Sequence, residues 1–113
     1  MTSVSMAGEN MSYKLVYTAS FHTSLENLIR QWADYEISDA TIERYVQKIF
    51  FAISSLKIFS NRYHDVSELY DLETPARRII IGSRYAIFYR VFPNQETILV
   101  GKIFNFKQGN IEF

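Results

Sequence analysis

The chain contains no cysteine, and it has only two prolines and four glycines. Without cysteine there can be no disulfide scaffold, no thiolate nucleophile and no zinc site built on sulfur, and a reducing compartment is expected. The first residues, "MTSVSMAGENMS", lack a basic end followed by an apolar core. No apolar run approaches the roughly 20 residues that a membrane helix needs. The sequence therefore predicts a cytoplasmic protein that does not bind membranes.

The length of 113 residues is sufficient for one domain and leaves little room for a second. Apolar residues make up 48% of the chain and aromatic residues 16%, which is typical of a globular protein and not of a disordered one. Regular patterns begin only after Met11. We therefore expect a flexible extension over residues 1–10 and a single domain over residues 11–113.

The net charge is zero, but the basic residues are unevenly distributed. Between Thr74 and Lys107 the only acidic residue is Glu96, whereas six residues are basic: Arg77, Arg78, Arg84, Arg90, Lys102 and Lys107. Such a chain can present a positive face to an anion while it stays neutral overall. The alternative is that the arginines serve only to keep the edges and faces of strands soluble.

Two amphipathic helices are predicted in the first half of the chain. Thr23 and Glu26 match a capping box, so the first helix is expected to begin there, with Phe21 packing against its entry. Ser38 or Asp39 offers the side-chain oxygen that a second helix start prefers, and that helix should run to about residue 59. Each helix carries one apolar stripe: Leu25, Leu28, Ile29 and Trp32 in the first, and Ile42, Val46, Ile49, Ile53 and Leu56 in the second.

Strands are predicted on both sides of this helical pair. One short strand precedes it, with Tyr13, Leu15 and Tyr17 on its better buried face. Three more are expected at about 77–82, 84–92 and 97–106, joined by turns at "GS" and "PNQE". A helical hairpin buries its stripes only against something flat. The sequence therefore predicts an α+β fold in which the hairpin packs on one face of a small, mostly antiparallel sheet.

The strand at 84–92 has two dissimilar faces. Alternation places Tyr85, Ile87, Tyr89 and Val91 on one face, which suits the core under the helices. The other face combines Ala86, Phe88, Arg90 and Phe92. Together with Phe104 and Phe106 of the last strand, this set predicts an exposed surface that is both aromatic and basic. Large exposed apolar patches usually bind a partner.

Histidine and carboxylate residues give no catalytic or metal-binding pattern. His22 is expected at a helix start and His64 in the connector between the second helix and the sheet, and for each a surface or capping role is favoured. Glu68 is near His64 only in sequence. Neither the histidines nor the carboxylates have the spacing of a metal site, so no metal and no cofactor are expected.

The order of elements and the segment "ARRIIIGSRYAIFYRVFPNQETILVGKIFN" resemble the RelE/ParE superfamily of bacterial type II toxins. In that family the central strand carries two tyrosines separated by two apolar residues and followed by a basic residue and valine, as in "YAIFYRV". The resemblance covers roughly residues 11–113. It implies the RelE/ParE-like fold predicted above, and a toxin that arrests growth and is neutralised by a cognate antitoxin.

One branch of the family cuts messenger RNA on the ribosome, which requires preorganised cations and a group that takes a proton from the attacking hydroxyl. The resemblance assigns the cations to Arg77, Arg78 and Lys107. It also implies an arginine after the first tyrosine of the central strand and a tyrosine near the C-terminus, where this chain has Ala86 and Phe113. Two of the catalytic groups of that branch are thus replaced.

Another branch, ParE-like, binds DNA gyrase and carries no nuclease residues, so the loss of these groups fits it slightly better. Asn105 stands about where that branch has a terminal His-Gly stretch. A third possibility is that the fold now serves only as an interaction module that binds an acidic peptide, in keeping with a sequence pI near 6.7. The residues expected to bind a target or antitoxin are Arg84, Arg90, Phe88, Phe92, Phe104 and Phe106.

Overall fold

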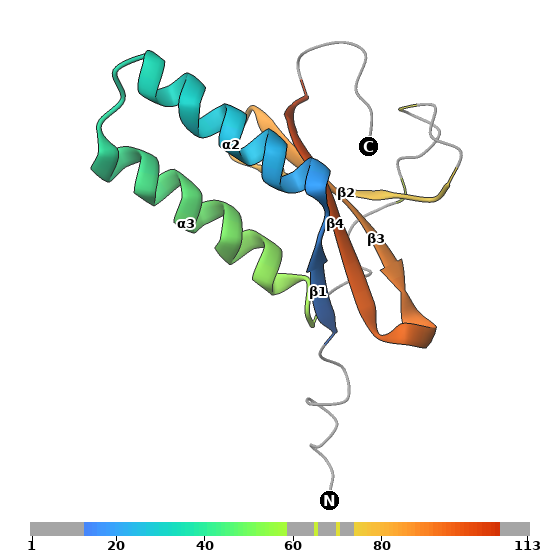
Figure 1. Cartoon of the computed structure of the whole chain (residues 1–113). Coiled ribbons are helices and arrows are strands. Elements are labelled where there is room, and N and C mark those ends of the chain that lie inside the picture. The colour runs from blue at the N-terminus through green and yellow to red at the C-terminus, as the bar shows by residue number, and fades with distance from the viewer. Residues whose placement is uncertain (1–12, 59–64, 66–69, 71–73, 107–113) are drawn as a thin grey trace, which may run out of the picture.

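The chain folds into two layers, a helical hairpin on a four-stranded sheet (Figure 1). The computed structural model describes residues 13–58, 65, 70 and 74–106. The predicted extension over residues 1–10 lies outside this range. The elements are β1 (Lys14–Tyr17), α2 (Ala19–Asp34), α3 (Asp39–Ser55), β2 (Arg77–Ile81), β3 (Tyr85–Phe92), a short 3-10 helix (Pro93–Gln95) and β4 (Thr97–Asn105).

The sheet has the strand order β1-β4-β3-β2. β1 runs parallel to β4, while the β4–β3 and β3–β2 pairs are antiparallel. Both helices cover the same face of this sheet (Figure 1). The predicted α+β class, the element order and the meander of three strands are therefore confirmed.

The start of the first helix was predicted at the wrong threonine. α2 begins at Ala19 and Thr18 is its N-cap, with a side chain that accepts a hydrogen bond from the Phe21 amide at 3.0 Å. The hydroxyl of Thr18 also donates to the carbonyl oxygen of Val100 in β4, at 2.9 Å. Thr18 thus ties the helix start to the sheet, which Thr23, inside the helix, cannot do.

The second helix follows the sequence prediction more closely. Ser38 is the N-cap of α3 and accepts a hydrogen bond from the Thr41 amide at 3.2 Å. The helix ends at Ser55, with Leu56 as its C-cap, and so is shorter than expected. Four members of the predicted stripe are buried and Val46 packs against them, which confirms that this stripe faces the sheet.

The main core lies between the helices and the sheet. β3 contributes Ile87 and Tyr89, neither of which is exposed to solvent, and β4 contributes Ile98, Val100 and Ile103. Tyr85 and Val91 pack against the same cluster. The predicted inner face of the central strand is thereby confirmed.

β4 carries one extra residue opposite Phe88. Ile87 pairs with Ile103 but Tyr89 pairs with Val100, so a single residue of β3 faces both Gly101 and Lys102. This two-against-one arrangement is a β-bulge, which bends the strand locally. At the bulge the Ile103 amide donates to the Ser24 hydroxyl of α2 at 3.1 Å, and that hydroxyl donates to the Phe21 carbonyl at 3.0 Å.

Ser24→Ala is expected to lower the free energy of unfolding by about 2 kcal/mol, because the buried Ile103 amide would lose its acceptor. Ser55→Ala is the matched control, since the Ser55 hydroxyl only donates to the Ala52 carbonyl of its own helix at 2.6 Å. Urea unfolding of both variants measures the difference. Equal stability of the two variants would show that the bond between α2 and the bulge does not stabilise the fold.

Candidate functional site

The sheet face away from the helices is not the open aromatic surface that the sequence predicts. Ala86 and Phe88 have no exposed area and Phe104 is 4% exposed. These three form a second small core, against which Tyr70 and Phe106 pack. The expectation that Phe88 and Phe104 are exposed is therefore wrong.

Among the described residues, Tyr70, from the connector before β2, covers this face together with Phe106. Its ring centroid lies 5.0 Å from that of Phe88 and 5.6 Å from that of Phe104, both nearly perpendicular. The Phe88 and Phe104 rings are 4.5 Å apart. Edge-to-face rings at such distances attract each other beyond the area that they bury. The sequence gives no sign of this role, because a single tyrosine in a polar connector belongs to no periodic pattern.

Arg78 also lies on this face, since its partner across β2 and β3 is Phe88. Its Nη1 donates a hydrogen bond to the Tyr70 hydroxyl at 2.6 Å. The guanidinium carbon is 5.7 Å from the Tyr70 ring centroid and 5.9 Å from that of Phe106, within the range of cation–π attraction. Arg78 thus holds Tyr70 in place over the second core.

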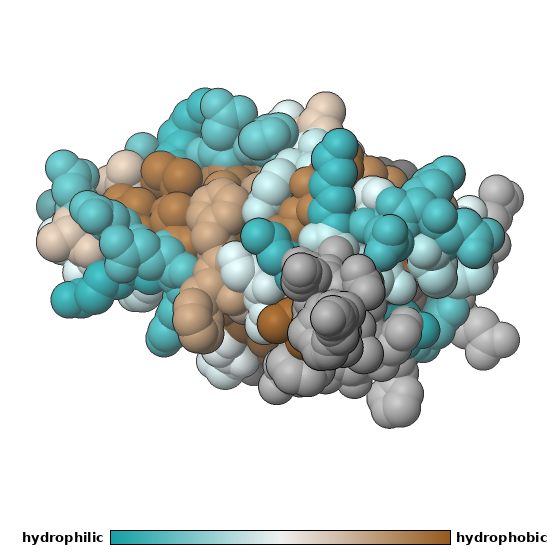
Figure 2. All heavy atoms as spheres, turned by 90° about the horizontal axis from the view of Figure 1, so that it is seen from below, coloured by the Kyte–Doolittle hydropathy of each residue, from teal (hydrophilic) through white to brown (hydrophobic). Residues whose placement is uncertain are grey.

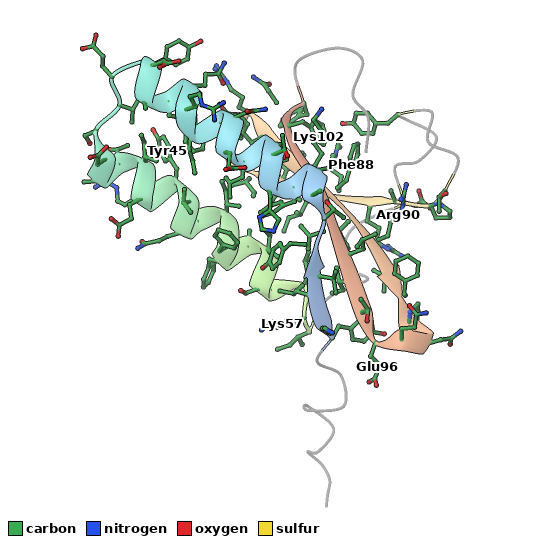
Figure 3. All side chains as sticks on the ribbon, viewed as in Figure 1. Tyr45, Lys57, Phe88, Arg90, Glu96 and Lys102 are labelled. Carbon is green, nitrogen blue, oxygen red and sulfur yellow. The ribbon has the colours of Figure 1, made fainter. Side chains whose placement is uncertain are left out.

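Arg77 and Arg90 lie at another place on the sheet. Arg77 pairs with Tyr89 and so points to the face opposite that of Arg78, as alternation predicts. The two arginines line a cavity of about 140 Å³, together with Asp65, Pro75, Ala76, Val91 and Pro93. Asp65 and Arg77 also form an isolated β-bridge. Figure 3 shows Arg90 near the start of β2, on the side of the molecule away from the helices.

A larger groove of about 440 Å³ opens between the far end of the helical hairpin and the β2–β3 turn. Four aromatic residues line it, and two of them are joined by a hydrogen bond from Trp32 Nε1 to the Tyr85 hydroxyl at 3.3 Å. The only charged residues at the groove among those described are Lys48 and Arg84. The full lining is Trp32, Tyr35, Ile37, Tyr45, Lys48, Ile49, Ile81, Gly82, Ser83, Arg84 and Tyr85.

Three of the aromatic rings that line this groove pack edge to face. The Trp32 ring is 5.1 Å from Tyr45, at 69°, and 5.9 Å from Tyr85, at 82°. In Figure 3 Tyr45 lies between α3 and α2. Gly82, with a φ of +68°, makes the turn that carries Arg84 to the rim. The groove can therefore take apolar side chains between its rings while its two cations attract an acidic neighbour.

The residues predicted as one site are dispersed over the structure. Arg84 is at the groove, Arg78 is at the second core, and Arg90 is at the small cavity. Phe92 is 39% exposed at the end of β3 and Phe106 is half-buried beside Arg78. Lys107, Phe113, His64 and Glu68 lie outside the described residues. Sequence analysis missed Tyr45 and Lys48, which adjoin the apolar stripe of α3 but are not part of it.

The described residues contain neither a metal-binding cluster nor a membrane-spanning helix. No three His, Cys, Asp or Glu side chains within them are close enough to share a metal ion. No helix in the same part of the chain is long and apolar enough to cross a bilayer. One pKa shift stands out near α3, where burial raises the pKa of the Tyr17 hydroxyl.

The chain is similar to proteins of bacterial toxin-antitoxin systems. Residues 15–108 match a family model described as the ParE toxin of the type II toxin-antitoxin system parDE. No curated protein matches the sequence. Among solved structures, the chain is similar to one from the RelBE2 toxin-antitoxin complex of Mycobacterium tuberculosis, with 17% identity, a TM-score of 0.49, and coverage of 83% of this chain and 98% of that one.

Proposed function

The chain belongs to the family of ParE toxins of type II toxin-antitoxin systems, and we propose that it arrests growth by binding DNA gyrase and not by cutting messenger RNA. Such a toxin acts in the cytoplasm. Two features support gyrase as the target: the ParE-like branch of the family binds gyrase, and the described part of the sheet face away from the helices is packed as a small core.

One observation carries the choice between the two targets. Ala86 occupies the position where a nuclease of this superfamily is expected to carry an arginine, and it is wholly buried as a member of the second core. The neighbouring cation, Arg78, is held between the Tyr70 and Phe106 rings. A nuclease needs cations that can reach a developing phosphate charge. This face is packed as a small core, which suits a toxin that acts by binding.

A second candidate, the ribosome-dependent nuclease, is favoured by the same tyrosine. The hydroxyl of Tyr70 accepts a hydrogen bond from Arg78 at 2.6 Å. Tyr70 could thus supply the phenol that Phe113 lacks, with Arg78 as its adjacent cation. In this alternative, Arg77 and Lys107 remain candidates for the other cations. The Tyr70 hydroxyl is then the group whose removal distinguishes the two functions.

We further propose that the cognate antitoxin is bound at the groove between the helical hairpin and the β2–β3 turn. The groove offers Trp32, Tyr45 and Tyr85 to apolar side chains. Lys48 and Arg84 offer two positive charges at the same place. An acidic segment with apolar anchors would fit both features, and such a segment can fold as it docks.

The target is tested by expressing the chain from a tightly controlled promoter and mapping messenger RNA ends soon after induction. In parallel, the purified protein is titrated into a DNA gyrase supercoiling reaction. Growth arrest with inhibited supercoiling and no new RNA ends supports the proposal. Cuts within translated codons contradict it and favour the nuclease. Absence of growth arrest would leave the interaction module as the better description.

Reversing both groove charges, Lys48→Glu with Arg84→Glu, is expected to weaken antitoxin binding at least about 10-fold, because an acidic segment would now be repelled. Arg30→Glu, at an exposed position of α2 outside the groove, is the matched control. Titration calorimetry with the cognate antitoxin measures both. Unchanged affinity of the groove variant would place the antitoxin elsewhere.

A further inference from the structure

The outward face of α3 carries more exposed apolar surface than a solvent-facing helix needs. Phe51 is 80% exposed, Ile58, just past the helix end, 60%, and Phe50 37%. The inner side of the Phe50 ring packs against two other rings: its centroid lies 5.9 Å from the ring centroids of Tyr17 and of Phe21. Figure 2 shows apolar surface gathered on the helical half of the molecule between hydrophilic rims. Contiguous patches of this kind mark interaction sites.

Charged residues of opposite sign flank this patch at equal distances from its middle. Glu43 precedes Phe50 by seven residues (50 − 43) and Lys57 follows it by seven (57 − 50). Steps of four and three connect Glu43, Gln47, Phe50 and Ser54 on one exposed stripe of α3, and a further step of three reaches Lys57, which is exposed in the turn just after the helix. Each charge is two helical turns, or about 10 Å, from Phe50. Figure 3 shows Lys57 at the end of α3 beside β1.

We propose that two copies of the chain associate through antiparallel α3 helices, related by a two-fold axis at Phe50. In that register Glu43 of each copy lies opposite Lys57 of the other, the Phe50 and Phe51 side chains meet in the middle, and Ile58 lies at the edge of the contact, next to Lys57. A two-fold interface requires one surface that complements itself. Opposite charges at equal distances from an apolar centre meet this requirement, whereas a different partner would not need such symmetry. The proposal does not depend on whether the target is gyrase or messenger RNA.

The strength of the dimer follows from its size. α3 has 17 residues and is therefore about 25 Å long and about 10 Å wide. A contact along one helix buries less than the roughly 800 Å² per partner of a standard interface. The dissociation constant is therefore expected in the micromolar range, and the association depends on concentration.

Sedimentation velocity of the full chain from about 1 to 500 μM tests the proposal. A monomer–dimer equilibrium is expected, and Phe51→Glu should raise its dissociation constant about 30-fold or more, as for a central apolar side chain at an interface. Because Phe51 is so exposed, this substitution leaves the fold intact, which circular dichroism verifies. Phe92→Glu, an exposed phenylalanine on β3, is the matched control and should dimerise as the parent does. A parent chain that stays monomeric over the whole range would overturn the proposal.

The register is tested by charge exchange. Glu43→Lys alone and Lys57→Glu alone each place like charges opposite one another twice per dimer, and each should weaken association about 3- to 10-fold at low salt. The double variant, Glu43→Lys with Lys57→Glu, restores the pairing with reversed signs and should recover the parent affinity. Failure of the double variant to recover, or single variants that bind as the parent does, would overturn the antiparallel register.

Discussion

An arginine at position 86 is expected to unfold the chain and not to give it nuclease activity. Ala86 has no exposed area and belongs to the second core with Phe88 and Phe104. A guanidinium at this position would be buried among aromatic rings without a carboxylate, at a cost of several kcal/mol. We expect Ala86→Arg to lower the free energy of unfolding by about 4 kcal/mol or more, a large part of the 5–15 kcal/mol typical of a domain. Urea unfolding measures the loss.

Ile80→Arg is the matched control for this substitution. Ile80 is the direct partner of Ala86 across β2 and β3, so the two side chains project from the same face of the sheet, but Ile80 is 43% exposed. The arginine at position 80 can extend into solvent, and a change of less than about 1 kcal/mol is expected. If Ala86→Arg were as stable as this control and cut messenger RNA, both the close packing of the second core around position 86 and the gyrase proposal would be refuted.

The strand faces are the part of the fold that sequence reasoning predicted best. Side chains in a strand alternate strictly, so the positions of Ile87 and Tyr89 under the helices and of Phe88 on the other face follow from periodicity alone. The alternation of side chains does not predict which residue packs over the outer face of the sheet. Tyr70 reaches it from an irregular connector, and the position of such a residue depends on tertiary contacts with Phe88 and Arg78.

The helix starts illustrate a second limit. The start of α3 was predicted at Ser38 or Asp39, and Ser38 is the N-cap, because its hydroxyl accepts a hydrogen bond from the Thr41 amide nearby in the sequence. At the first helix, the sequence prediction chose Thr23, because Thr23 and Glu26 match a capping box. Thr18 prevails because its hydroxyl also reaches Val100, 82 positions away in the chain. A local pattern contains no information about that bond.

The groove was not predicted because its walls come from three separate segments. Trp32 and Tyr35 end α2, Tyr45 and Lys48 lie on α3, and Arg84 and Tyr85 follow the β2 turn. Only Arg84 was among the residues expected to bind a partner. Trp32 was predicted to be in the core, and it is 5% exposed, yet it also borders the groove. In the sequence, a residue that both packs in the core and lines a groove cannot be told from one that only packs in the core.

Removing the Tyr70 ring is expected to open the outer face of the sheet. Tyr70→Ala would remove the ring contacts to Phe88 and Phe104 and the partner of Arg78, and should lower the free energy of unfolding by about 3 kcal/mol. It should also increase binding of a fluorescent dye that recognises exposed apolar surface. Urea unfolding and dye titration measure the two effects. A stable variant that binds no more dye than the parent would show that Tyr70 does not cover this face.

Tyr70→Phe separates the hydroxyl from the ring and thereby the two candidate functions. The ring still covers Phe88 and Phe104, and only the hydrogen bond to Arg78 is lost, at about 1 to 2 kcal/mol. If the chain acts by binding gyrase, growth arrest and inhibition of supercoiling should persist at the parent level. If the Tyr70 hydroxyl takes part in RNA cleavage, the same variant should lose most of its cleavage while it remains folded, since a positioned acid–base group contributes about 100-fold or more. The Tyr70→Phe variant therefore uses the hydrogen bond between Arg78 and Tyr70 to decide between the two targets.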